Sequence, residues 1–283
     1  METTRHVAQA PEMAARRIPS SGEPIPVVGI GTYAGFDVAP HDDRYAALPA
    51  VLDALFAAGG SVIDSSPMYG RAEQTVGELL AAQAPQRKPF LASKVWTTGR
   101  EAGIAEMHRS LELLRTERLD LMQVHNLVDW RTHLATLRDW KERGLVRYIG
   151  VTHYKAAAHA ELEAVLRTEA IDFVQVNYSM VEPEAADHLL PFAAERGVAV
   201  IANRPFGGKS LMRSVRGRAL PEWAGGLGAS TWSDLAIAFV LAHDAVTCVI
   251  PGTGSAAHMA ANVAAARVVL SQAQQRELLT LLR

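Results

Sequence analysis

The chain has 283 residues, of which 49% are hydrophobic and 20% charged, with a formal net charge of -2. This composition is typical of a globular protein of one large domain or two ordinary ones, and the charge gives no electrostatic basis for binding nucleic acid or an acidic membrane. A single cysteine, Cys248, excludes an internal disulfide, and no apolar run approaches the roughly 20 residues that span a bilayer. We therefore predict a cytoplasmic protein without nucleic-acid or membrane partners.

The first residues predict an extension ahead of the folded domain. Residues 1–15 are expected to be loosely ordered, and the domain is expected to run from 16 to 283. Arg16 and Arg17 raise the alternative of a twin-arginine export signal, but no apolar stretch follows them. The segment 16–26 contains a Ser-Gly turn and predicts a short turn or hairpin that closes the bottom of the fold.

Eight short β-rich runs alternate with segments of helical spacing along the rest of the chain. The runs are 27–33, 62–66, 90–96, 119–126, 147–154, 173–179, 198–205 and 248–253. Helical apolar spacing occupies 48–59, 73–83, 104–115, 133–144 and 161–169. Gly59, Gly144 and Gly197 are stop signals before strands, and 271–283 predicts one extra amphipathic helix.

This alternation predicts an α/β fold with parallel strands buried on both faces. Eight β/α units in a chain of this length close most naturally into a single (β/α)8 TIM barrel. A doubly wound open sheet is the competing fold, and it would place a glycine-rich dinucleotide loop after the first strand. Gly29 and Gly31 lie within that strand and the third glycine is missing, which favours the barrel.

Active sites of such barrels lie at the carboxyl ends of the strands. The side chains predicted there are Tyr33, Asp64, Lys94, His125, Thr152, His153, Gln175, Asn177, Asn203 and Gly252. Taken alone, Asp64 is readily explained as a turn cap and His125 as a core histidine. Together the set is harder to explain structurally, because an aspartate and a lysine on adjacent buried strands need each other's charge.

Asp64, Lys94 and His125, with Tyr69 on the loop after the second strand, form a usable chemical device. A tyrosine hydroxyl has a pKa of about 10, and a neighbouring ammonium favours its phenolate. An aspartate holds the lysine charged, while a histidine orients a carbonyl oxygen. Such a site delivers a proton to an oxygen that becomes negative as hydride reaches its carbon.

The motifs around these residues resemble the aldo-keto reductase superfamily. The segment GGSVIDSSPMYGRAEQTVGELL is similar to that family's G-x-x-x-x-D-[TS]-[AS]-x-x-Y-G-x-[AS]-E pattern, LASKVW to its lysine strand and LDLMQVHN to its histidine strand. The resemblance implies a (β/α)8 enzyme that interconverts carbonyls and alcohols. It implies Tyr69 as general acid, Lys94 and Asp64 as its tuning pair, and His125 as the residue that orients the carbonyl.

The resemblance also implies NADP(H) as cofactor, with NAD(H) as the alternative. The residues it places at the cofactor are Gly31, Thr32, Tyr33, Asp64, Thr152, His153, Gln175, Asn203, Arg204, Pro205, Phe206, Gly207, Gly252, Thr253, His258 and Asn262. Asn203 stands where the family has the aromatic that stacks on nicotinamide. Gly252, Thr253 and His258 replace the frequent lysine, serine and arginine.

The replaced lysine and arginine grip the 2′-phosphate that distinguishes NADP from NAD. We therefore expect a weaker NADP preference than the family's habit. Thr253 and Ser255 precede a predicted helix, whose N-terminus is able to hold phosphate. Lys209, or an arginine between 211 and 218, is a candidate for compensation.

The substrate pocket is predicted from residues just beyond the strand ends. Tyr33, Trp96, Asn126 and Trp130, together with Phe36, would give an aromatic mouth for a small carbonyl compound with an apolar body. Trp130 packing under its own loop is the alternative. A monomer or small homo-oligomer is expected.

Two other functions remain as alternatives. One is a catalytically weak nucleotide-binding regulatory or sensor protein on the same fold, which the altered cofactor segment keeps open. The other is a metal-dependent hydrolase, which usually needs two or three histidines clustered at strand ends. His125 and His153 are a thin set, so no metal is predicted.

Overall fold

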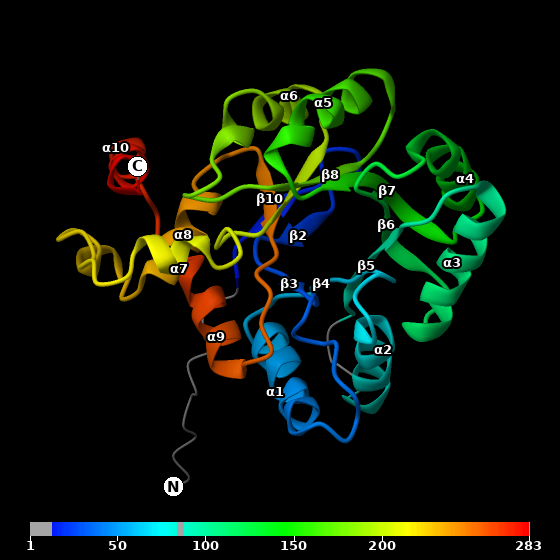
Figure 1. Cartoon of the computed structure of the whole chain (residues 1–283), viewed down its shortest axis with the longest axis horizontal. Coiled ribbons are helices and arrows are strands. Elements are labelled where there is room, and N and C mark those ends of the chain that lie inside the picture. Colours follow the sequence, from blue (N-terminus) through cyan, green and yellow to red (C-terminus); the bar gives the residue numbers. More distant parts are fainter. Residues whose placement is uncertain (1–12, 84–87, 283) are drawn as a thin grey trace, which may run out of the picture.

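The computed structural model describes residues 13–83 and 88–282, and its centre is a parallel eight-stranded sheet ringed by helices (Figure 1). The strands are β3 (Ile30–Gly31), β4 (Val62–Asp64), β5 (Phe90–Val95), β6 (Leu119–His125), β7 (Val146–His153), β8 (Phe173–Asn177), β9 (Ala199–Asn203) and β10 (Val246–Val249). Each strand pairs in parallel with the next along the chain. Parallel bridges from Val28 to Val249 and from Gly31 to Gly252 join the two ends of the sheet, so the predicted (β/α)8 barrel is confirmed.

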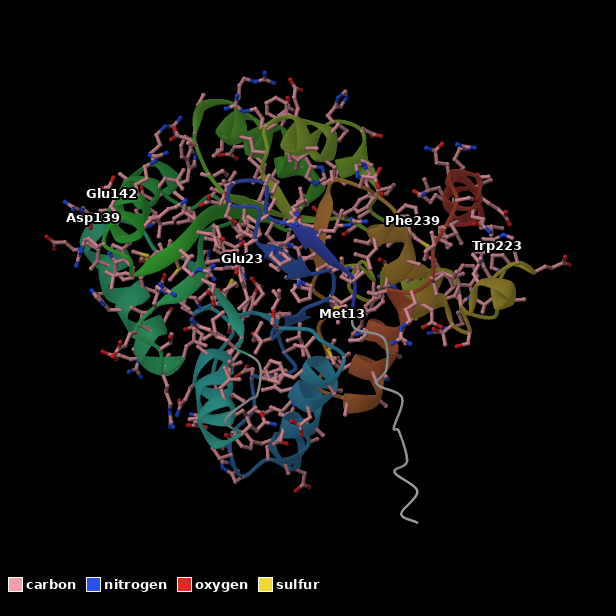
Figure 2. All side chains as sticks on the ribbon, turned by 180° about the vertical axis from the view of Figure 1, so that it is seen from behind. Met13, Glu23, Asp139, Glu142, Trp223 and Phe239 are labelled. Carbon is pink, nitrogen blue, oxygen red and sulfur yellow. The ribbon has the colours of Figure 1, made fainter. Side chains whose placement is uncertain are left out.

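The helices follow the strands as the sequence predicts. They are α1 (Asp43–Ala57), α2 (Ala72–Gln83), α3 (Arg100–Leu113), α4 (Trp130–Glu142), α5 (His159–Thr168), α6 (Leu189–Glu195), α7 (Ser210–Ser214), α8 (Trp232–Leu241), α9 (Ala256–Ala265) and α10 (Gln272–Leu282). Gly59, Gly144 and Gly197 have positive φ directly after helices, where a side chain would be strained. The extra helix expected near the C-terminus is α10. Trp223, in the segment between α7 and α8 (labelled in Figure 2), donates from Nε1 to Glu277 of this helix at 3.0 Å.

A hairpin of β1 (Ala15–Arg17) and β2 (Pro24–Pro26) lies against the barrel, as predicted. Ile18 and Ile25 of this hairpin are buried with the apolar side chains of the barrel interior. Glu23, labelled near the centre of Figure 2, forms an ion pair with Arg147 and accepts from the Tyr148 hydroxyl at 2.6 Å. The hairpin therefore closes one end of the barrel and leaves the other end for the site.

Residues 1–12 of the predicted extension lie outside the described residues. Residues 13–15, which were expected to be loosely ordered, are part of the fold, because Met13 N donates to Ala58 O at 3.1 Å and Ala15 belongs to β1. The arginine pair also has a structural explanation. Arg16 donates to the carbonyl oxygens of Leu241 at 2.7 Å and His243 at 3.0 Å, which leaves those backbone groups satisfied.

The barrel interior changes from apolar to polar along each strand. Val62 is part of the apolar layer near the hairpin, whereas Asp64, two residues later on the same face, lies in a polar layer. The eighth strand differs from its prediction of 248–253, since β10 ends at Val249. Pro251 has no N–H for the ladder, and Gly252 after it belongs to no strand but forms the isolated bridge to Gly31.

Candidate active site

A buried ion pair lies at the centre of the polar layer. Lys94 Nζ is 2.6 Å from Asp64 Oδ2, and both residues are almost completely inaccessible to solvent. The same ammonium donates to the carbonyl oxygen of Ser65 at 2.7 Å. Asp64 is in register with Ala92 of β5, so Lys94 lies two residues further along the same face, close to Asp64 as the sequence predicts. The pair satisfies two charges that would each be costly alone.

Two glutamines complete the hydrogen bonding of the aspartate. Gln175 Nε2 donates to Asp64 Oδ1 at 2.8 Å, and Gln123 Nε2 donates to the same oxygen at 3.2 Å. Gln123 was not among the predicted site residues. It could have been predicted from the two-residue period of a β-strand, because it lies two positions before His125 in β6 and therefore faces the same interior.

The turn after β4 carries Tyr69 over this pair. Tyr69 N donates to Ser66 O at 3.0 Å, and Lys94 Nζ lies 4.9 Å from the centroid of the tyrosine ring. Gly70 has a φ of +60°, and a Cβ there would lie 2.2 Å from Asp37 Oδ1. Asp37 also accepts from Arg71 N at 2.9 Å, so the loop after β3 holds the turn that positions Tyr69.

Burial and charge act in opposite directions on Tyr69 and Lys94. Burial raises the pKa of Tyr69 above its usual 10, and the Lys94 ammonium offsets this rise only in part. Lys94 lowers the pKa of Tyr69, as the sequence predicts, but the rise caused by burial is larger. Burial lowers the pKa of Lys94, yet Asp64 and Tyr69 outweigh it and raise the net pKa. At neutral pH the site therefore holds a protonated tyrosine above a charged lysine.

His125, at the end of β6, lies beside the tyrosine. The ring centroids of Tyr69 and His125 are 6.0 Å apart, and His125 Nδ1 is 3.1 Å from Ser66 Oγ. Burial and the charge of Lys94 lower the pKa of His125 from 6.5 to about 3. The imidazole is therefore neutral, which suits a hydrogen-bonding role toward a carbonyl oxygen.

We expect His125 to stay neutral through the range in which an ordinary histidine titrates. The unfolded chain binds this proton near pH 6.5, but the folded protein binds it only near pH 3. The free energy of unfolding therefore decreases, and the protein becomes less stable, as pH falls below about 6.5. In proton NMR titrations the His125 Cε1–H resonance should stay constant from about pH 8 to about pH 5. A midpoint near pH 6, with an exposed histidine as internal pH reference, would contradict the burial of this ring.

The predicted aromatic mouth is present in part. Tyr33 is 66% exposed with its ring 5.1 Å from Tyr69, and Trp96 is 43% exposed with its ring 6.3 Å from His125. Asn126 has a φ of +52°, and its Oδ1 is buried without a partner among the residues that the structure describes. Two exposed aromatics thus flank Tyr69 and His125.

Phe36, also expected at the mouth, is completely buried in the core, so its prediction is wrong. Trp130 is half-buried against the main core and has the Arg131 guanidinium 4.1 Å from the centroid of its ring. Its place in the substrate pocket stays a prediction.

Several residues that the resemblance assigns to the cofactor already have structural partners. Gly31 N donates to Pro251 O at 3.2 Å across the barrel closure, and Thr32 Oγ1 donates to Ser65 Oγ at 2.9 Å. Thr152 Oγ1 lies 3.5 Å from Gln175 Oε1, with both side chains at the ends of neighbouring strands. His153 stacks on the next residue, Tyr154, with ring centroids 5.7 Å apart.

The aspartate fixes the orientation of Asn203 through a chain of amides. Because Asp64 Oδ1 accepts from Gln175 Nε2, Gln175 Oε1 faces Asn203 and accepts from its Nδ2 at 3.3 Å. Asn203 Oδ1 is then left buried without a partner in the described part of the chain. Amide O and N assignments rest on such networks, and the acceptor-only carboxylate decides this one.

The residues that follow Asn203 form a tight loop. Arg204 has a φ of +53° and pairs with Glu182 at 3.4 Å, while its guanidinium lies 5.8 Å from the ring centroid of Tyr154. Pro205 is buried and Phe206 packs against the core. Gly207 also has positive φ, and a Cβ there would lie 2.4 Å from Ser210 Oγ.

The last predicted cofactor segment leads into α9. Ser255 caps this helix and accepts from His258 N at 3.4 Å, while Thr253 Oγ1 accepts from Ser255 N at 3.1 Å. The His258 side chain is exposed, and Asn262 is buried one turn further on. Arg218, one of the suggested compensating arginines, instead donates to Leu281 O, so it ties the loop to α10.

Two kinds of feature were not found in the described residues. Over 13–83 and 88–282, no three His, Cys, Asp or Glu side chains cluster as metal ligands would. In the same ranges, no helix combines the length and apolarity needed to cross a membrane.

The barrel thus places the Tyr69 hydroxyl group near a buried lysine–aspartate pair with a neutral histidine beside it, an arrangement suited to proton transfer. The sequence signature of the Aldo/keto reductase family matches residues 27–282, and the chain belongs to this family. The family resemblance predicted from the motifs is thus confirmed.

Individual relatives agree with this assignment. The chain is 29% identical over 272 residues to a methylglyoxal reductase of Escherichia coli, with 93% of each chain covered. It is 28% identical over 255 residues to pyridoxine 4-dehydrogenase of the same species, covering 82% of this chain and 85% of that one. An aldo-keto reductase of Klebsiella pneumoniae, solved in complex with NADPH, superimposes with a TM-score of 0.80 at 25% identity, covering 95% and 96% of the two chains.

Proposed function

We propose that this protein reduces aldehydes or ketones to alcohols by hydride transfer from NAD(P)H. The observation that carries the proposal is the placement of Tyr69 directly above the Lys94–Asp64 ion pair, with Lys94 Nζ 4.9 Å from its ring centroid. In this arrangement the Tyr69 hydroxyl keeps its proton at neutral pH, and the positively charged Lys94 ammonium lies beneath the ring. The names of the similar reductases support the same reaction class.

In the proposed mechanism, Tyr69 and His125 act on the carbonyl oxygen, and Lys94 and Asp64 act through Tyr69. The reduced nicotinamide supplies the hydride when bound. Tyr69 gives its hydroxyl proton to the oxygen as negative charge develops there, and His125 orients that oxygen through a hydrogen bond. Lys94 stabilises the tyrosinate that remains, because the two charges attract in a site of low dielectric. Asp64 keeps the ammonium charged and in place.

The residues at the strand ends fit a nicotinamide cofactor. Asn203 Oδ1 is a buried acceptor without a donor among the described residues, and it lies next to Gln175 and Thr152. The carboxamide N–H of a nicotinamide would supply such a donor. Asn203 would thus replace stacking by hydrogen bonding. The capped N-terminus of α9 suits a phosphate of the cofactor. A solved relative with NADPH bound supports the cofactor class.

The direct test of activity is NADPH consumption with 4-nitrobenzaldehyde and a panel of small carbonyls that includes methylglyoxal. We expect turnover with at least the apolar aldehydes, because Tyr33 and Trp96 flank the mouth. Tight NADPH binding without turnover on any member of the panel would favour the sensor alternative. Cytoplasmic location and a monomeric or small homo-oligomeric state stay predictions.

We expect NADPH and NADH to differ in kcat/KM by no more than about tenfold, because His258 offers no permanent charge for a bidentate phosphate contact. His258→Arg should raise the preference for NADPH roughly tenfold or more. Ala264→Arg is the matched control, since it adds the same charge to α9 at another exposed position. A strong NADPH preference in the unaltered protein would overturn this expectation.

A further inference from the structure

Ser66 is a buried hydroxyl that the proposed mechanism does not use, and its contacts are restricted. Among the described residues, Ser66 Oγ has two hydrogen-bond contacts. It lies 3.1 Å from His125 Nδ1, and it accepts from Met68 N at 3.4 Å. The side chain is completely buried, so solvent supplies no further partner.

Only one arrangement of protons satisfies both groups. A serine hydroxyl has a single proton to donate, and the backbone N–H of Met68 is a donor only. If His125 Nδ1 carried the ring proton, the Ser66 proton would have no acceptor in this enclosed position. If Ser66 donates to Nδ1, the amide, the hydroxyl and the imidazole are all satisfied. Buried polar groups strongly favour the satisfied arrangement.

The neutral state of the ring makes this choice matter. A charged imidazole would carry protons on both nitrogens, but the environment of His125 holds it neutral. One nitrogen is therefore a donor and the other an acceptor. Nε2 has no partner in the described residues and is not among their fully enclosed atoms, so it is the nitrogen free to meet a substrate.

We propose that Ser66 is a positioning residue that fixes His125 in the tautomer with the proton on Nε2. The histidine then presents a hydrogen-bond donor to the carbonyl oxygen, next to the proton donor Tyr69. With the opposite tautomer, Nε2 would present a lone pair to the oxygen and repel it. This inference rests on the proposed function for its catalytic meaning, but the tautomer is a property of the protein alone.

The test is long-range proton–nitrogen NMR of the ¹⁵N-histidine-labelled full chain without ligand, with the His125 signals assigned from their loss in His125→Asn. We expect the Nε2–H pattern in the unaltered protein. The Nδ1–H pattern, or a mixture of the two, would overturn the proposal without any further variant. Because no turnover is involved, an inactive protein with the Nε2–H pattern would contradict the proposed function and leave this inference standing.

Ser66→Ala should convert the single tautomer of His125 into a mixture and lower kcat roughly three- to tenfold, the factor that one hydrogen bond is worth. KM should change less, because the contact to the carbonyl oxygen strengthens as charge develops on it. Ser65→Ala is the matched control for the spectrum, since its hydroxyl contacts Thr32 and not the histidine. An unchanged tautomer pattern in folded Ser66→Ala would overturn the proposed role of the serine.

Discussion

Replacing Tyr69 by phenylalanine is expected to lower kcat by about 10²- to 10⁴-fold, the range that a positioned general acid contributes. The substitution removes the hydroxyl that we propose as the proton source, whereas the ring that packs over the Lys94 ammonium at 4.9 Å is retained. Cofactor affinity, measured by quenching of tryptophan fluorescence, should stay close to that of the unaltered protein. Steady-state reduction of 4-nitrobenzaldehyde provides the rate.

Tyr45→Phe is the matched control for this substitution. Tyr45 lies in α1, and its hydroxyl donates to Glu78 at 2.9 Å, on the outer layer of the barrel. Removal of that hydroxyl should leave kcat within about twofold, the range expected for a surface change. If Tyr69→Phe kept most of its activity, another group would have to supply the proton, and the assignment of Tyr69 would be wrong.

Replacing Lys94 by methionine should have the largest effect on stability. Asp64 would keep the hydrogen bonds from Gln123 and Gln175 but lose its only cationic partner among the described residues. Breaking a buried pair in this way costs about 3–5 kcal/mol, because one charge is left uncompensated. Urea unfolding followed by circular dichroism measures the loss. Activity should also fall, since no charge remains to stabilise the tyrosinate.

A double variant separates the ion pair from simple packing. Asp64→Asn together with Lys94→Met removes both charges, so its free energy of unfolding should lie well above that of Lys94→Met alone. Arg143→Met is the surface control, because the side chains of Arg143 and its partner Asp139 are 59% and 48% exposed, and Asp139 lies at the edge of the molecule in Figure 2. It should cost less than about 1 kcal/mol. Equal destabilisation of the single and double variants would show that volume, and not charge, dominates.

Parallel strands explain how much of the site could be predicted. The carboxyl ends of such strands meet at one rim, so Asp64, Lys94 and His125 could be brought together from strand order alone. Tyr69 could be added because the turn after Asp64 is short. The hairpin, the eight strands and the last helix followed from apolar period and glycine signals in the same way.

The remaining features depend on side-chain contacts that strand order does not contain. Whether Phe36 faces the mouth or the core is decided by the path of a loop, and this path places it in the core. The hydrogen bond that Ser66 donates to His125 depends on the 3.1 Å between Ser66 Oγ, in the loop after β4, and His125 Nδ1, at the end of β6. The pKa of Tyr69 likewise depends on how deeply its hydroxyl is buried, because burial raises this pKa and Lys94 lowers it. The sequence alone does not give that depth.

Isotope transfer tests the proposed reaction most directly. Incubation of the protein with an aldehyde and NADPH deuterated at the transferring position should give an alcohol with one deuterium on the former carbonyl carbon. The hydroxyl proton should come from solvent, through Tyr69. Mass spectrometry of the isolated alcohol measures the deuterium on carbon, because that label does not exchange with water whereas the hydroxyl proton does. An alcohol without deuterium, or no alcohol at all from an active-site-intact protein that binds NADPH, would contradict carbonyl reduction by this site.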